Sequence, residues 1–334
     1  MKRREFITGL GGATVTWPLA ARAQQREALR KVAMLLPFSP DDPEGRRRLE
    51  AVREGLRQLG WSEDRNLSLE VRWVGNDHGP GAQDSAEELA AHDPEVIFAG
   101  TTVALRAVTR ATTSIPIVFA AVADPVGSGF IQSLARPGGN LTGFSYLEPT
   151  MVEKWLELLK EIAPETRRVL FVYDPQRVSS VDPAFCMPWR LEAGSRTLGL
   201  TPINVSVHGI ADVEKALAAA ADTPGTGLIV GSDAFLFPHR KEITASAARY
   251  RLPAVYYFRE WVASGGLVSY GPDVIDTYRR APQYIDRILR GARPSDLPVQ
   301  EPTTFELVVN RSTAKDLHLD IPLSILARAD EVIE

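Results

Sequence analysis

The feature that most constrains the fold is an alternation of short apolar runs with longer segments of helical period, which begins at residue 31. The runs are rich in Val, Ile and Phe, as in KVAMLLPF and EVIFAG, and they have the length of buried strands. Between these two runs, residues 44–59 place Leu49, Val52, Leu56 and Leu59 on one face of a helix. Strands that alternate with amphipathic helices are typical of a parallel sheet with crossover helices, so we expect an α/β fold.

This strand and helix pattern occurs twice in tandem. The first series contains five expected strands and ends near Tyr146, and the second series begins with a helix over residues 150–164. A short helix is expected over residues 127–135, with the sequence GSGFIQSLA, between the last two strands of the first series. The chain has 334 residues, which is enough for two domains of ordinary size. We therefore expect two Rossmann-like α/β lobes, each a parallel sheet flanked by helices, with a ligand cleft between them.

The first 23 residues have the order of an export signal. Lys2, Arg3 and Arg4 precede a Gly- and Thr-rich apolar run that is too short to span a bilayer. The triplet Ala21-Arg22-Ala23 then resembles a signal peptidase site, which predicts cleavage near Ala23. The adjacent arginines before Phe6 resemble the twin-arginine signal. We expect a periplasmic protein; the alternative is a frayed basic N-terminus on a cytoplasmic one.

Composition and motifs argue against several classes of function. The formal net charge is −4 at pH 7, which does not favour nucleic acid as a partner. Cys186 is the only cysteine and the five histidines form no H-x-x-x-H pair, so neither an internal disulfide nor a metal site is expected. The chain contains no G-x-S-x-G pentapeptide and no complete phosphate-binding glycine motif. We therefore expect no catalysis and no cofactor.

The candidate binding residues follow the expected strands, because ligands of open parallel sheets bind at the carboxyl ends of the strands. From the first series the candidates are Phe38, Ser39, Thr101, Thr102, Asp124 and Tyr146. From the second series they are Asp174, Asp233, Phe235, Phe258, Glu260 and Tyr270. Two lobes that face each other would enclose a cleft between these two sets.

Each kind of candidate has a binding role and a plainer structural alternative. The hydroxyls of Thr101 and Thr102 at a helix start favour a carboxylate, whereas a helix N-cap is the alternative. The carboxylates can hold a ligand ammonium, although Asp124-Pro125 is also an ordinary turn. The aromatic candidates provide flat apolar walls, or they pack the core and the hinge.

Three long segments resemble the ABC transporter substrate-binding proteins of the tryptophan/tyrosine-binding group. They are IPIVFAAVADPVGSGFIQSLARPGGNLTGFS, the stretch from GGLVSYGPDV to TTFELVVN, and the ending ILARADEVIE. The resemblance implies a type I periplasmic-binding-protein fold that closes on a small ligand, an aromatic or apolar amino acid or a related carboxylate. It also implies a membrane permease and an ATPase as partners of a monomeric binding protein. The expected lobes are residues 30–145 with about 271–300, and residues 146–270 with about 301–334.

The chain departs from this family pattern at one cleft loop. Where relatives tend to have an asparagine-rich NPNNP segment, this chain has Asp174-Pro175-Gln176-Arg177-Val178-Ser179-Ser180. An acid and a base replace amide side chains there, which leaves the identity of the ligand open. A second function also stays open, a periplasmic sensor that presents its ligand to a receptor kinase.

Overall fold

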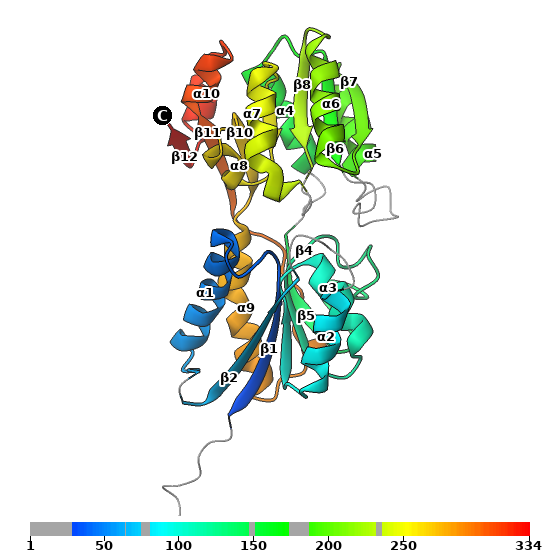
Figure 1. Cartoon of the computed structure of the whole chain (residues 1–334), viewed down its shortest axis with the longest axis vertical. Helices are drawn as coiled ribbons and strands as arrows, with labels where there is room; N and C mark the ends of the chain where they lie inside the picture. Colours follow the sequence, from blue (N-terminus) through cyan, green and yellow to red (C-terminus); the bar gives the residue numbers. More distant parts are fainter. Residues whose placement is uncertain (1–28, 64, 75–80, 147–150, 174–186, 232–235) are drawn as a thin grey trace, which may run out of the picture.

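The chain folds into two α/β lobes that lie one above the other along the long axis of the molecule (Figure 1). The computed structural model describes residues 29–63, 65–74, 81–146, 151–173, 187–231 and 236–334. The expected export signal, Cys186 and the site candidates Asp174, Asp233 and Phe235 lie outside these ranges, as does the loop 174–180. Among the helices of the described ranges, none has the length and hydrophobicity that a membrane span requires.

Lobe 1 contains a parallel sheet of five strands in the order β2-β1-β3-β4-β5. The strands are β1 (Arg30–Leu36), β2 (Leu67–Trp73), β3 (Val96–Ala99), β4 (Ile117–Val122) and β5 (Leu141–Ser145). Every residue of β3, β4 and β5 is buried, because helices cover both faces of the sheet. These strands read as continuous apolar runs for that reason.

Two pairs of helices cover the sheet of lobe 1. One face packs against α1 (Pro43–Gln58) and α9 (Val274–Leu289), and the other against α2 (Gly81–Ala91) and α3 (Thr102–Ala111). Helices α1 and α9 approach closely where Pro282 meets Gly55, since a Cβ on Gly55 would lie 2.6 Å from the Pro282 ring. Helix α9 is therefore part of lobe 1 although it follows a strand of lobe 2 in the sequence (Figure 1).

Lobe 2 repeats the strand order of lobe 1 and extends it. Its sheet has the order β12-β11-β10-β9-β8-β6-β7, in which only the β10 and β11 pair is antiparallel. The strands are β6 (Arg168–Tyr173), β7 (Thr201–Ser206), β8 (Thr226–Val230), β9 (Ala254–Tyr256), β10 (Val268–Pro272), β11 (Phe305–Asn310) and β12 (Glu331–Ile333). The series β7-β6-β8-β9-β10 matches the order 2-1-3-4-5 of lobe 1. The tandem repeat of the sequence pattern is thus a repeat of topology.

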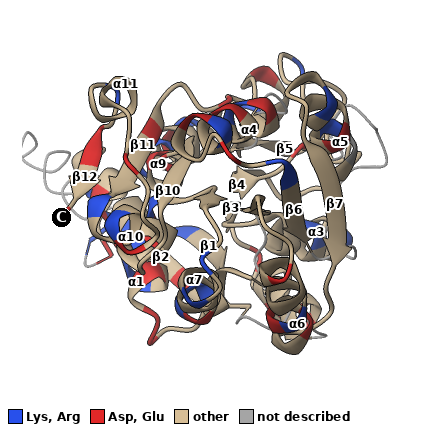
Figure 2. Ribbon diagram, turned by 90° about the horizontal axis from the view of Figure 1, so that it is seen from above, with Lys and Arg blue, Asp and Glu red and all other residues tan. Residues whose placement is uncertain are grey.

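Helices also cover both faces of the second sheet. One face holds α4 (Met151–Ile162), α5 (Met187–Thr197), α10 (Arg311–Asp316) and α11 (Leu323–Leu326). The other face holds α6 (Ile210–Ala221), α7 (Arg240–Arg249) and the short α8 (Arg259–Ala263). Charged residues lie mainly on these helices and on the loops, whereas the strands are mostly uncharged (Figure 2).

The chain passes between the lobes three times. It crosses after β5, between β10 and α9, and again before β11. Residues just before the third crossing are attached to lobe 1, where Thr142 Oγ1 donates to the Leu297 carbonyl at 2.7 Å and Gln300 N donates to the Gly143 carbonyl at 3.0 Å. The lobe limits expected near residues 145, 270 and 300 stay a prediction.

The helix expected over residues 127–135 is absent, and that prediction is wrong. The segment forms turns, in which Ser128 N donates to the Asp124 carbonyl at 3.0 Å and Phe130 N to the Pro125 carbonyl at 3.0 Å. Gly129 has a φ of +74°, which a right-handed helix does not allow. Two glycines within three residues favoured the turn over the helix.

Candidate ligand-binding cleft

The two threonines after β3 lie where the sheet of lobe 1 ends. Thr101 is the N-cap of α3, and its hydroxyl oxygen accepts from Ala104 N at 3.2 Å. The hydroxyl oxygen of Thr102 accepts from Ala123 N at 3.1 Å, which ties the start of α3 to the end of β4. Each hydroxyl therefore accepts from the backbone while its proton is available to donate. Thr101 therefore is a helix N-cap, the plainer of the two expected roles. Its hydroxyl proton is still free to donate to an anion at the N-terminus of α3, where anions bind favourably.

Asp124 follows β4 directly and is almost completely buried, with 4% of its surface exposed. Its Oδ1 accepts from Gly127 N at 2.8 Å, which is the contact of an Asp-Pro turn. Its Oδ2 is buried and has no hydrogen-bond partner among the residues that the structure describes. Because buried carboxylate oxygens normally have a donor, this atom is the best candidate to accept from a ligand. Ala123, the residue before Asp124, donates its backbone N–H to Thr102. Asp124 and Thr102 therefore lie at the same edge of the lobe 1 sheet.

Four aromatic rings run from lobe 1 to lobe 2 along the interlobe region. Tyr146 lies 6.1 Å from Phe258, Phe258 lies 5.8 Å from Phe237, and Phe237 lies 5.8 Å from Phe38, measured between ring centroids. Of these, Phe237 was not among the predicted site residues. Tyr270, the remaining predicted aromatic residue within the described ranges, stacks on Phe305 at 5.9 Å in the neighbouring strand.

Phe38 belongs to lobe 1 but packs with the core of lobe 2. It belongs to the buried apolar cluster that otherwise consists of lobe 2 residues, and the ring of Phe237 lies 5.8 Å from its own ring. Its φ is +69°, an unfavourable conformation for a bulky side chain. Such strain persists only where the surroundings impose it. Ser39, the next residue, is exposed, and its carbonyl accepts from Asp42 N at 3.1 Å.

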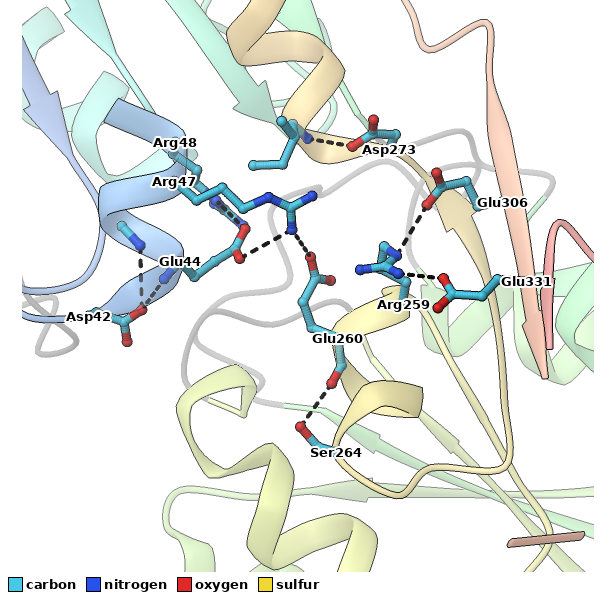
Figure 3. Close-up of polar contacts among 12 residues, drawn as sticks. Asp42, Glu44, Arg47, Arg48, Arg259, Glu260, Ser264, Asp273, Glu306 and Glu331 are labelled. Atoms are coloured by element: carbon cyan, nitrogen blue, oxygen red, sulfur yellow. Dashed lines mark hydrogen bonds and ion pairs between the residues drawn. The ribbon is translucent and has the colours of Figure 1, made fainter. Parts of the chain in front are cut away.

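An interlobe charge cluster, which we define as Glu44, Arg47, Arg48 and Glu260, lies beside these rings (Figure 3). Arg47 on α1 reaches Glu44 at 3.8 Å and Glu260 on α8 at 3.9 Å. Arg48 Nε lies 3.4 Å from Glu44 Oε1 on the same helix. Glu260 was predicted from the sequence, whereas the three residues of α1 were missed. The only signal for them was the i, i+4 spacing of Glu44 and Arg48.

The environment of Glu260 raises the pKa of its carboxyl above the ordinary glutamate value. Burial is the main cause, and the negative charge of Glu44 adds to it, while Arg48 and Arg259 oppose the shift. A carboxyl group with a raised pKa in the folded state takes up a proton more readily there than in the unfolded chain. Ionisation of Glu260 therefore costs the folded state free energy relative to the unfolded chain.

We expect the contribution of Glu260 to the free energy of unfolding to fall with rising pH. The fall should begin at the ordinary glutamate pKa, about 4.3, and end above the raised pKa of Glu260. Glu260→Gln removes this charge, so its urea midpoint should exceed that of the wild type at pH 7, and the gain should vanish near pH 4. The control is Glu63→Gln, which removes an exposed partner of Arg53. A gain of equal size in the control, or a gain that is the same at both pH values, would contradict this prediction.

A separate hollow of about 520 Å³ lies on lobe 2 between β7 and α6. Its lining is largely apolar and includes Leu170, Ile203, Val205 and Ala216. None of the predicted site residues that the structure describes lines this hollow, so it does not coincide with the predicted ligand site.

Comparisons with known proteins agree with the two-lobed architecture. A family model described as ABC transporter substrate binding protein matches residues 32–333. A tyrosine-binding protein of Clostridioides difficile (strain R20291) is 26% identical over 270 residues, which are 80% of this chain and 75% of the relative. The crystal structure of a conserved domain protein from Vibrio cholerae is similar, with a TM-score of 0.81 and 28% identity over 91% of this chain and 99% of that one. An ABC domain from Streptococcus pneumonia in complex with L-Trp has a TM-score of 0.82 and 24% identity, over 92% and 100% of the two chains.

Proposed function

Because the chain belongs to the family of ABC transporter substrate-binding proteins, we propose that it captures an aromatic amino acid between its lobes and delivers it to a membrane permease with its ATPase. The names of two relatives support this ligand class, since one is a tyrosine-binding protein and another was solved with L-Trp. We further propose that it acts in the periplasm as a monomer, after removal of residues 1–23.

The observation that carries the proposal is the buried Oδ2 of Asp124, which has no hydrogen-bond partner in the described part of the chain. A ligand ammonium would give this oxygen the donor it lacks, through a charge-assisted hydrogen bond. The ligand carboxylate would lie at the start of α3, where the hydroxyls of Thr101 and Thr102 donate. Tyr146 and Phe258 would provide the apolar walls for the side chain. Recognition of both ends of an amino acid and of its side chain thus needs contacts from both lobes.

Closure follows as a shift in population between open and closed lobes. The two lobes already contact each other through the rings of Phe38 and Phe237 and through Arg47 and Glu260. A ligand that touches both lobes adds to these contacts only in the closed form, and it shifts the equilibrium by its difference in affinity for the two forms. Micromolar binding corresponds to about −8 kcal/mol, which a charge pair, a helix-terminus contact and an apolar wall supply together.

Isothermal titration with L-tryptophan, L-tyrosine and L-phenylalanine tests the proposal directly. We expect a Kd in the micromolar range for at least one of them. Indole-3-propionate, which lacks the amino group of tryptophan, should bind at least tenfold more weakly than L-tryptophan, a loss of about 1.4 kcal/mol. If none of the three amino acids binds, or if the analogue without the amine binds equally well, the proposed ligand class is wrong.

A further inference from the structure

We propose that Tyr278 and Arg48 are positioning residues that hold the Thr101-Thr102 loop in its binding geometry, and that lobe 2 acts on this loop through them. The proposal rests on the proposed function, because it assigns roles to residues that surround the same cleft. Neither residue was a predicted site residue, since Tyr278 lies in the middle of the hydrophobic face of α9.

Tyr278 connects α9 to the loop through its hydroxyl group. The side chain is fully buried, and the hydroxyl donates to the carbonyl of Gly100. Gly100 directly precedes Thr101, the N-cap of α3, so this bond fixes the peptide from which the cap begins. A Cβ on Gly100 would lie 3.0 Å from the Tyr278 hydroxyl oxygen, closer than ordinary contacts allow. Glycine at this position lets the hydroxyl reach the carbonyl.

Arg48 acts on the same hydroxyl. Its guanidinium carbon lies 4.9 Å from the centroid of the Phe38 ring and 5.3 Å from that of the Tyr278 ring, so two aromatic rings hold the cation. The side chain is buried, so its positive charge lies against the Tyr278 ring with little screening by water. A cation over the ring of a phenol draws electron density from it and makes the hydroxyl a stronger donor, so Arg48 strengthens the bond from Tyr278 to Gly100.

Lobe 2 reaches the surroundings of Arg48 through Phe237 and Glu260. Phe38, which covers one face of the guanidinium, packs on Phe237 of lobe 2. Glu260 on α8 interacts electrostatically with Arg48 and lies 3.9 Å from Arg47 (Figure 3). When the lobes separate, Phe38 loses the Phe237 ring and Arg48 loses the nearby charge of Glu260, so the hold of Arg48 on Tyr278 weakens. By reciprocity, a ligand that orders the loop favours closed lobes.

The test compares Tyr278→Phe with the matched variant Tyr284→Phe. Tyr284 lies on the same helix, is also buried, packs on Phe144 at 4.9 Å and donates its hydroxyl to the Pro298 carbonyl at 2.6 Å. Both variants lose one buried hydroxyl group, so we expect similar losses in melting temperature. Only Tyr278→Phe should weaken binding of L-tryptophan, by at least tenfold, whereas Tyr284→Phe should change it less than twofold.

Amide hydrogen exchange of the ligand-free protein gives a second readout. Exchange of residues 101–105 should become at least tenfold faster in Tyr278→Phe and stay unchanged in Tyr284→Phe. Glu260→Gln, a change in the other lobe, should also alter exchange of residues 101–105, whereas Glu63→Gln should not. Equal effects of the two tyrosine variants on exchange, or no effect of Glu260→Gln there, would overturn the proposal. If wild-type protein binds no amino acid, the proposed function fails, and the exchange experiment still decides this inference.

Discussion

Replacement of Asp124 with asparagine is expected to weaken binding of the amino-acid ligand by about thirtyfold or more, which corresponds to about 2 kcal/mol. Asparagine keeps the Oδ1 acceptor that binds Gly127 N at 2.8 Å, so the turn after β4 should persist. It places an amide nitrogen where Oδ2 is buried, and a nitrogen cannot accept from an ammonium group. The ligand ammonium would therefore be desolvated without an acceptor. Titration calorimetry measures the loss.

Two controls separate loss of the amine contact from a general effect. Asp296→Asn also removes one negative charge from lobe 1, but from an exposed ion pair with Arg293. The affinity of this variant for L-tryptophan should match that of the wild type. Indole-3-propionate lacks the amine, so its weak binding should not change in Asp124→Asn. If Asp124→Asn lowers the affinity for this analogue and for L-tryptophan by the same factor, Asp124 supports the local structure after β4 and does not bind the amine.

Trp155→Ala is expected to cost about 3–5 kcal/mol in the free energy of unfolding, the largest stability effect that we predict. The indole of Trp155 is completely buried in lobe 2, and its Nε1 donates to the Tyr270 carbonyl at 2.7 Å. The ring also packs edge-on against Tyr257 at 5.3 Å, and Tyr257 donates to the Tyr146 carbonyl at 2.6 Å. Trp155 thus supports residues next to two of the crossings between lobes. Urea denaturation followed by circular dichroism measures the loss.

Trp61→Ala is the matched control for this prediction. Trp61 is only half-buried in lobe 1, and its Nε1 donates to Asp286 at 2.8 Å. Its replacement should cost no more than about 2 kcal/mol, because less apolar area leaves water on folding. Comparable losses in the two alanine variants would show that the indole of Trp155 does not have the structural role assigned to it.

The secondary structure was predictable where burial on both faces produced a continuous apolar run. The apolar runs KVAMLLPF and EVIFAG correspond to the strands β1 and β3, and the helix expected over residues 150–164 occupies Met151–Ile162. The helix expected over residues 127–135 was wrong, because the bond from Gly127 N to the Asp124 side chain favours a turn. Helix α8 was not expected, since five residues are too few to show a helical period.

The candidate site was predictable only in part. The rule that ligands bind at carboxyl ends of parallel strands led to Thr102 and Asp124, which the backbone of Ala123 connects. It did not lead to Arg48 or Tyr278. An arginine next to the apolar stripe of α1 reads as a surface residue, and its burial depends on rings from other parts of the chain. Whether the twelve predicted residues bind a ligand stays a prediction.

The sequence by itself determined the local elements and the repeat of one α/β pattern, because side-chain periodicity and strand length are properties of neighbouring residues. It also identified the polar groups at strand ends, since those follow from the direction of each strand. Only the tertiary structure decided which lobe receives α9, which rings meet between the lobes, and which charges face each other there. Phe38 and Phe237 lie almost 200 positions apart in the chain, and no local pattern encodes a contact that exists only because two separately folded lobes are brought together by three crossings of the chain.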